Sequence, residues 1–542
     1  MKFQKLIVLL WILGISQGAI AQKKIQKKDS IANRNWYNMD FKKDHILGIS
    51  TEKAYSELLK NRKARTVIVA VIDGGTDTSH EDLKEVLWTN KKEIPGNGLD
   101  DDGDGYIDDV HGWNFIGGKD GKDIGKDTYE ATRVLADLEP YFRNKPRNTL
   151  SPEEQKKYDL YIKVKQDYVK QRSESDEEVN RLNPILKMVN YYNDLVKNNY
   201  HVTTIDSNFL NKTKSEDPAM KQALFVSGRL LKLGYVNVDS AISDLKGGIQ
   251  HTQDKLSYGL DTAFNPRSSI IGDHYSDWKE RNYGNKDITG PDALHGSHVS
   301  GIIGAKRNNG KGINGVANHV EIMTVRVVPD GDERDKDVAN GIRYAVDNGA
   351  EIINMSFGKG YSPYKEAVDD AVKYAESKGV LLVHAAGNES TNKDSLGNFP
   401  NPNYLSGGTA KNWIEVGASA RDTGQKMVAN FSNYGKNTVD LFAPGVDIYS
   451  SVPFKNQYKN ESGTSMASPV VTGLAAVLKS YFPYLTAVQL KDIILKTAVK
   501  YHNKVLLPGS KDKLVPFDSL SITGGVANLY EAVKLALTYP VK

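Results

Sequence analysis

Short apolar runs alternate with amphipathic stretches along much of the chain. Residues 332–348 and 363–379 each fill the gap between two such runs with helix-compatible sequence that ends near a glycine. This is the sequence expected of crossover helices between parallel strands. The apolar runs of strand length lie at residues 67–72, 322–328, 352–355 and 380–383. The pattern predicts an α/β fold with a mainly parallel central sheet flanked by helices.

The segment after Gly125 has a different composition. Residues 126–227 contain no glycine, although the chain has 47 glycines in 542 residues. Ser151-Pro152-Glu153-Glu154 is a capping box with proline at the first helical position, so it predicts the start of a helix. Apolar and tyrosine residues then recur at helical spacing on both sides of Asn183-Pro184. We expect an all-α insertion built as a helical hairpin or small bundle.

The amino terminus has the features of a secretory signal. Lys2 and Lys5 precede an apolar stretch over residues 6–15, and Ala19-Ile20-Ala21 follows. This order of charge, apolar core and small residues predicts cleavage after Ala21. A membrane anchor is the alternative, but the stretch has about half the ~20 residues that a spanning helix needs. We expect an exported protein, periplasmic or extracellular, without a stable membrane anchor.

Composition narrows the functional classes. With 39% hydrophobic and 25% charged residues, the chain falls in the ordinary globular range. The formal net charge of +4 gives no indication of a nucleic-acid partner. Cysteine is absent, which excludes disulfides, a thiol nucleophile and cysteine-ligated zinc.

The chain divides into five predicted parts. They are a signal peptide (1–21), an N-terminal segment (22–64), the first part of the α/β domain (65–123), the helical insertion (124–270) and the second part of the α/β domain (271–542).

Two candidate catalytic residues lie in VIDGG and HGSHVSG. Asp73 ends an apolar strand, where open parallel sheets hold their sites, although such an aspartate alone could equally bind a ribose, a metal or a loop. His295 and His298 are three residues apart. Zinc-binding helices space their histidines four apart around a glutamate, so a zinc site is disfavoured.

Two more candidates follow in AAGNES and GTSMASP. Ser465 stands at the start of a long apolar helix, where unpaired backbone N–H groups favour a developing negative charge. Taken alone, this serine would more often be a helix cap. Asn388 follows a buried strand and has an amide that can donate a hydrogen bond, or it simply forms a turn.

Taken together and in order, VIDGGTD, HGSHVSG, NMSFG, AAGNES, FSNYG, APG and GTSMASP resemble the subtilisin-like (subtilase, S8) serine peptidases. The resemblance covers residues 65–120 and 285–535. It implies the three-layer subtilisin-like fold and an exported serine endopeptidase that acts on proteins or peptides, with no cofactor required for the chemistry. It also implies roles for four residues: Asp73 orients the base, His295 is the general base, Ser465 is the nucleophile, and Asn388 donates to the oxyanion.

The resemblance also implies a substrate cleft. Ser356, Phe357 and Gly358 would add the substrate backbone as a strand, with Ala385, Ala386 and Gly387 opposite. Phe357 would help to line the first specificity pocket, which favours an apolar or aromatic side chain before the cleaved bond.

An acidic loop predicts a structural calcium ion. Asp100, Asp102 and Asp104 offer oxygens at alternate positions before Gly105, and Asp108 follows. The twelfth position of this loop is a histidine, so it is not an EF-hand. A solvated acidic turn is the alternative.

Some questions stay open at the level of sequence. The functional alternative is a catalytically inactive binding protein with the same fold. An NAD-binding α/β protein is disfavoured, because this sequence lacks the phosphate-binding glycine fingerprint of that class. The segment between the predicted cleavage point and Arg65 is short for a subtilase propeptide. The insertion would either cover the cleft or be a surface decoration. The oligomeric state is unknown.

Overall fold

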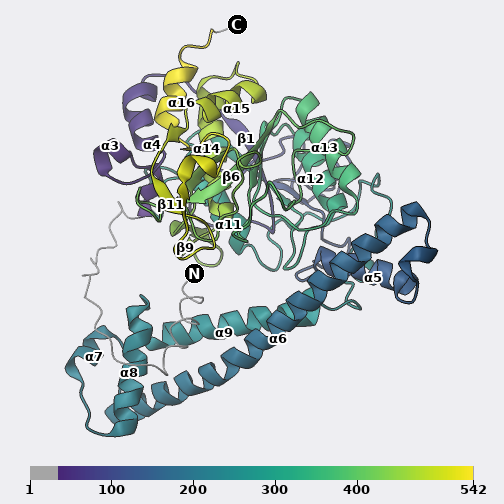
Figure 1. Ribbon diagram of the computed structural model, residues 1–542. Helices are drawn as coiled ribbons and strands as arrows, with labels where there is room; N and C mark the ends of the chain where they lie inside the picture. The colour runs from purple at the N-terminus through teal and green to yellow at the C-terminus, as the bar shows by residue number, and fades with distance from the viewer. Residues whose placement is uncertain (1–33, 541–542) are drawn as a thin grey trace. The chain divides into compact units, whose positions relative to one another are not determined.

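A nine-stranded sheet forms the centre of the α/β unit, in a computed structural model that describes residues 34–540 (Figure 1). The predicted signal peptide lies outside the described residues. The strands of the sheet are β1 (Val67–Asp73), β2 (Gly112–Asn114), β3 (Val320–Arg326), β4 (Ile352–Met355), β5 (Leu381–Ala385), β6 (Trp413–Ser419), β7 (Leu441–Pro444), β10 (Val499–Lys500) and β13 (Gly525–Val526).

The strands run in the order β10-β13-β7-β6-β5-β4-β1-β3-β2. Neighbouring strands are parallel except for the β10–β13 pair. The predicted mainly parallel α/β fold is therefore confirmed. The chain places β3 on one side of β1 and β4 on the other, so the direction of winding reverses at β1. In open α/β sheets, ligands bind outside the carboxyl ends of the strands at such a switch point.

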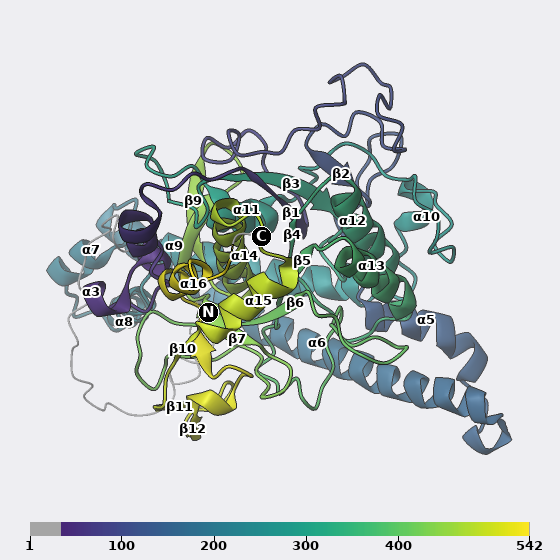
Figure 2. The same cartoon turned by 90° about the horizontal axis from the view of Figure 1, so that it is seen from above.

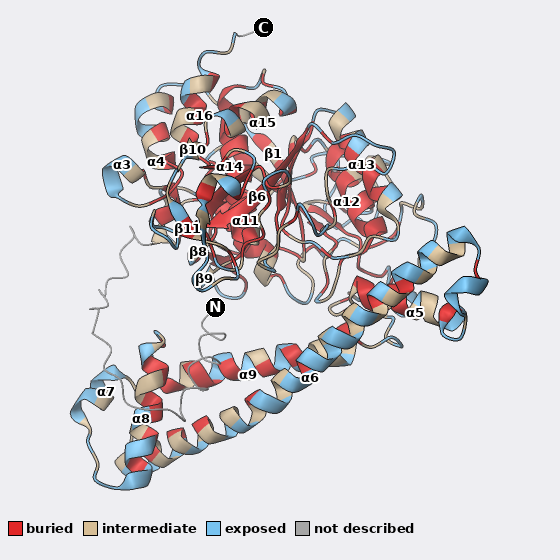
Figure 3. Ribbon diagram, viewed as in Figure 1, coloured by how far each residue is buried: buried red, intermediate tan, exposed pale blue. Residues whose placement is uncertain are grey.

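Helices cover both faces of the sheet. Helices α11 (Leu294–Gly304) and α14 (Thr464–Tyr481) lie on one face, and α12 (Asp335–Asp347) and α13 (Lys365–Ser377) lie on the other (Figure 2). The alternation of β1 follows this arrangement, because Val67, Val69 and Val71 join one apolar core while Ala70 and Ile72 join the other. These strands are buried on both faces (Figure 3).

The described part of the N-terminal segment, residues 34–64, contributes to the core of this unit. Its short helices are η2 (Trp36–Asn38), α3 (Phe41–Asp44), α4 (Thr51–Lys53) and η3 (Ala54–Leu59). Trp36 and Tyr37 are buried in the same apolar core as β1. The Tyr37 hydroxyl donates to the Asn314 carbonyl at 2.7 Å. Residues from Trp36 onward therefore contribute to the stability of the α/β unit.

A second compact unit comprises residues 131–264 among those described. Its helices are α5 (Glu130–Phe142, which begins in the α/β unit), α6 (Pro152–Tyr200), α7 (Ser207–Lys212), α8 (Pro218–Lys232) and α9 (Val238–Asp254), with short helical turns at Arg147–Thr149 (η4) and Lys255–Gly259 (η5). The predicted capping box is formed, since the Ser151 hydroxyl accepts from the backbone of Glu154 and the Glu154 carboxylate accepts from that of Ser151.

Of the two expected arrangements, the hairpin with a break at Asn183-Pro184 is wrong, because α6 continues through Pro184 as one helix of 49 residues. The small bundle is formed, since α6, α8 and α9 share one core. A proline inside a helix costs about 3 kcal/mol. Apolar packing opposes this cost: Leu182, Val189 and Val196 share a buried core with α8 and α9.

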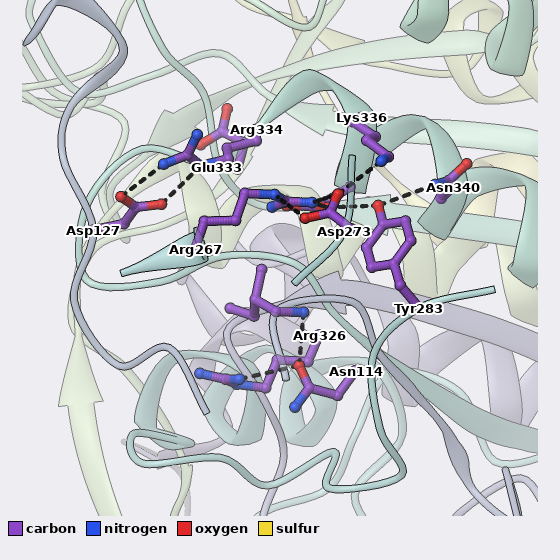
Figure 4. Close-up of polar contacts among 12 residues, drawn as sticks. Asn114, Asp127, Arg267, Asp273, Tyr283, Arg326, Glu333, Arg334, Lys336 and Asn340 are labelled. Atoms are coloured by element: carbon purple, nitrogen blue, oxygen red, sulfur yellow. Dashed lines mark hydrogen bonds and ion pairs between the residues drawn. The ribbon is translucent and has the colours of Figure 1, made fainter. Parts of the chain in front are cut away.

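Buried ion pairs fix the chain around α12 (Figure 4). Arg267 donates to Asp273 at 2.7 Å and to Asp337 at 2.7 Å, with all three side chains at most 3% exposed. Lys336 pairs with the same Asp273 at 2.7 Å. Arg334 binds Asp127 at 2.9 Å. Since burying a charge is costly unless it is paired, these groups hold residues 127 and 267–273 firmly in the α/β unit.

The remaining elements complete the described part of the chain. They are α10 (Arg267–Ile270), β8 (Ile448–Val452), β9 (Gln457–Glu461), α15 (Ala487–Lys496), β11 (Lys504–Leu506), β12 (Leu514–Pro516), η6 (Phe517–Ser519) and α16 (Leu529–Ala536). Within residues 34–540, none of the helices combines the length and apolarity needed to span a bilayer.

Candidate active site

Two glycines allow the predicted aspartate and histidine to meet. Asp73 is the last residue of β1, and His295 is the second residue of α11. A Cβ atom at Gly296 would clash with the carbonyl oxygen of Gly75, which itself has φ +133°. The loop after β1 and the first turn of α11 therefore approach closely only because both positions are glycine.

The carboxylate of Asp73 faces the imidazole of His295. The Nδ1 atom of His295 lies 2.8 Å from Oδ1 and 3.0 Å from Oδ2 of Asp73. Asp73 is buried, while the His295 side chain is 43% exposed. Burial lowers the pKa of His295, but the charge and hydrogen bond of Asp73, with smaller contributions from Glu461 and Asp292, raise it above its ordinary value. The imidazole is thus held by Nδ1 and strengthened as a base.

His298 makes its hydrogen bonds with residues other than Asp73 and His295. Its Nε2 atom is 3.1 Å from the carbonyl oxygens of both Ile448 and Lys459. Burial lowers the pKa of His298 to about 3, so the ring is neutral and donates from Nε2. These contacts assign His298 a structural role and leave His295 as the chemically competent histidine.

Ser465 occupies the first turn of α14, as predicted. Its Oγ atom donates to the Ser356 carbonyl at 3.0 Å. Among the described contacts this hydroxyl has no hydrogen bond with His295, so an attack assisted by the imidazole requires rotation of the serine side chain. Catalytic hydrogen bonds are often formed only in the substrate complex.

Asn388 and the Ser465 backbone converge on one point. The Oδ1 atom of Asn388 accepts from the backbone N–H of Thr464 at 2.8 Å and from its hydroxyl at 3.1 Å. This fixes the opposite Nδ2 group as the free donor. A Cβ atom placed on Gly463 would lie close to both donors, 3.7 Å from Asn388 Nδ2 and 3.6 Å from Ser465 N. Two N–H donors beside one nucleophile form the arrangement of an oxyanion hole.

Both predicted cleft edges contact this same turn of helix. Ser356 Oγ donates to the Ser465 carbonyl at 3.0 Å, and Gly387 N donates to Thr464 Oγ1 at 3.0 Å. Gly358 is exposed, whereas Ala385 and Ala386 are buried. Phe357 is half-buried against the apolar core on the α12 face, and its ring centroid is 6.4 Å from that of His384.

The acidic loop has a different grouping from that predicted. Carboxylate oxygens of Glu93, Asp100 and Asp102 lie within 4.8 Å of one another. Asp104 interacts electrostatically with this group: burial raises its pKa, and the negative charges of Asp102 and Asp100 raise it further. Asp108 instead accepts from Lys286 at 2.8 Å, and this contact lowers its pKa.

Sequence reasoning missed Glu93 and Thr464. Glu93 lies apart from the acidic run, and its Oε1 atom accepts from the backbone of Asp101 at 2.9 Å. Thr464 precedes the nucleophile and orients Asn388 through the contacts described above. Its position beside Ser465 in GTSMASP was the only available signal.

A buried carboxylate on imidazole, a serine at a helix start and two convergent donors are the groups that the chemistry of a serine hydrolase requires. A profile described as "Subtilase family" matches residues 64–516. The chain belongs to the subtilase family of serine endopeptidases.

Known proteins with similar sequences are named as serine proteinases or subtilisins. A "Thermophilic serine proteinase" of Bacillus sp. (strain AK1) is 33% identical over 301 residues, which are 53% of this chain and 70% of that protein. "Subtilisin DY" of Bacillus licheniformis is 36% identical over 223 residues, covering 39% and 75% of the two chains. A solved structure of proteases from Pseudoalteromonas arctica PAMC 21717 is 26% identical, covers 46% of this chain and 78% of its own, and gives a TM-score of 0.38.

Proposed function

We propose that the chain hydrolyses peptide bonds through an acyl-enzyme on Ser465. The observation that carries this proposal is the Asp73–His295 hydrogen bond at 2.8 Å, formed at the carboxyl end of β1, whose neighbour β4 leads to Ser356, the partner of Ser465 Oγ. An inactive binding protein would have no need of a buried carboxylate that strengthens an exposed imidazole. The comparisons with serine endopeptidases support the same choice.

In the first half of the reaction, Ser465 Oγ attacks the carbonyl carbon while His295 Nε2 accepts its proton. Asp73 stays ionised, holds the proton of Nδ1 and stabilises the imidazolium. Asn388 Nδ2 and Ser465 N donate to the oxyanion of the tetrahedral intermediate. The C–N bond then breaks, and His295 gives its proton to the leaving amine. Water deacylates the enzyme by the same steps, with His295 again as base.

Substrates of this peptidase are extended protein or peptide chains. Ser356–Gly358 and Ala385–Gly387 border Ser465 on two sides. An extended substrate would pair with the Ser356–Gly358 edge, because the N–H and carbonyl groups of Ala386 and Gly387 already have partners within the protein. Export follows from the predicted signal peptide. A named "Extracellular basic protease" of Dichelobacter nodosus, 33% identical over 231 residues, agrees with this location.

The acidic loop is the proposed site of a structural calcium ion. Its donors are hard carboxylate oxygens, which suit calcium. Burial raises the pKa of Asp109 to about 7, and the charges of Asp104 and Asp102 contribute. A bound cation would relieve this concentration of negative charge. Glu93, Asp100, Asp102 and Asp104 would hold it, whereas the carboxylate of Asp108 is paired with Lys286.

The decisive experiment compares the secreted wild-type protein with Ser465→Ala and His295→Ala on casein. The wild type should degrade casein, and both variants should lose at least about 10³-fold in rate. Ser395→Ala, at an exposed position, is the matched serine-to-alanine control. Equal hydrolysis by the wild type and Ser465→Ala would refute the assignment.

A further inference from the structure

The side chain before the cleaved bond must enter a pocket beside Ser465. This deduction rests on the proposed function, because the residue attacked by Ser465 carries that side chain. Gly358 follows Ser356, whose carbonyl accepts from Ser465 Oγ at 3.0 Å. Gly387 donates its backbone N–H to Thr464 at 3.0 Å on the other side. Gly358 and Gly387 therefore lie on the two segments that border Ser465, and the pocket is the space between these segments.

One amide group lies between these two segments. A Cβ atom at Gly358 would lie 2.8 Å from Nδ2 and 3.1 Å from Oδ1 of Asn398, and a Cβ atom at Gly387 would lie 3.3 Å from the same Nδ2. The Asn398 carboxamide is thus in contact range of both glycines. An aromatic ring needs van der Waals clearance on both of its faces, so the amide obstructs its passage between the segments.

The position of this amide is fixed by its surroundings. Its Oδ1 atom accepts from the backbone N–H of Phe399 at 3.0 Å, so the opposite group, Nδ2, is the one that faces the two glycines. Phe399 in turn pairs with the backbone of Lys359 in both directions, at 2.8 and 2.9 Å. Asn398 is therefore tied to the strand edge that continues from Gly358.

A carboxylate adds to the polar character of the same pocket. Glu389 Oε2 would lie 2.6 Å from a Cβ atom at Gly387, and Asn433 Nδ2 holds it at 2.5 Å. Phe357, expected to line the pocket, is half-buried against the apolar core, and its ring centroid lies 6.4 Å from that of His384. The pocket thus presents a hydrogen-bond donor on Asn398 and an acceptor on Glu389.

We propose that Asn398 is a specificity-determining residue, which makes the peptidase prefer a short polar side chain before the cleaved bond. Glutamine, asparagine and serine carry both a donor and an acceptor that match the two groups. Phenylalanine would leave the Asn398 donor without a partner, whereas Glu389 keeps its bond from Asn433, and a site with an unpaired polar group discriminates against the apolar analogue. This replaces the apolar or aromatic preference expected from the sequence.

The test measures kcat/KM on peptides that differ only in the residue before the cleaved bond: glutamine, serine, phenylalanine or lysine. The wild type should cleave the glutamine peptide at least about 10-fold faster than the phenylalanine peptide. Asn398→Gly should open the pocket and reverse this order. Asn398→Asp should shift the preference toward lysine. Ser395→Ala, an exposed position of the same loop, should leave the order unchanged.

The proposal is overturned if the wild type prefers phenylalanine to glutamine. It is also overturned if Asn398→Gly and Asn398→Ala both keep the wild-type order. Labelling of Ser465 with diisopropyl fluorophosphate is the separate check on the proposed function. Preserved labelling with an unchanged peptide order refutes only the role of Asn398, whereas absent labelling of the wild type refutes the catalytic assignment itself.

Discussion

Replacing Asp73 by asparagine should place the imidazole proton on the wrong nitrogen. Asp73 Oδ1 accepts from Gly74 N at 2.8 Å, so in Asp73→Asn the amide oxygen remains at that position. The new NH2 group then takes the place of Oδ2, 3.0 Å from His295 Nδ1, and donates to it. The proton of the neutral ring moves to Nε2, which can no longer accept the proton of Ser465.

The expected loss in kcat at neutral pH is about 10⁴-fold, or roughly 5.5 kcal/mol in the activation free energy. The pH profile should change as well. A general base acts when deprotonated, so activity rises with pH through the pKa of His295. Asp73 raises that pKa, and its removal should move the acid limb of the profile to lower pH.

The assay is kcat on a chromogenic peptide between about pH 5 and 9. Asp292→Asn is the matched control, because Asp292 also raises the pKa of His295 but accepts from the backbone of Leu294. It should move the acid limb in the same direction with a nearly unchanged plateau. A plateau for Asp73→Asn within tenfold of the wild type would refute the orienting role of this carboxylate.

Three further outcomes are expected. Asn388→Ala should lower kcat by about 10²- to 10³-fold with little change in KM, the known loss for one donor in a subtilisin; an unchanged kcat would remove Asn388 from the oxyanion hole. Chelation with EGTA should lower the melting temperature, and Glu93→Gln should weaken recovery by added calcium; a melting temperature indifferent to both would leave the acidic loop as a solvated turn. Glu130→Ala should destabilise the α/β unit by about 3 kcal/mol in urea unfolding, because Glu130 binds buried Lys359 at 2.6 Å; a change below about 1 kcal/mol would show that Asp335 suffices as the partner of Lys359.

The central strands of the sheet were predictable from their short apolar runs. The run at 352–355 coincides with β4, and the run at 67–72 with all but the last residue of β1. Both strands are buried on two faces, so they appear as continuous apolar runs. The continuation of α6 through Pro184 could not be predicted, because local propensity favours a break and the packing that opposes the break comes from helices distant in sequence.

The residues of the candidate site also differ in how far the sequence could predict them. Asp73, His295, Ser465 and Asn388 lie in motifs whose order is specific, and the structure brings the elements that carry them together. Glu93 and Asn398 lie in segments without a motif. They reach the acidic loop and the pocket through loop conformation, which single-sequence periodicity does not encode. Asp108 matched the loop spacing, but its lysine partner is 178 positions away.

The most direct test of the account is the site at which an active-serine reagent attaches. Wild-type protein treated with diisopropyl fluorophosphate and digested should carry the phosphoryl group on Ser465, and His295→Ala should react far more slowly. Modification at another residue, or equal reaction of the wild type and His295→Ala, would contradict the claim that His295 activates Ser465.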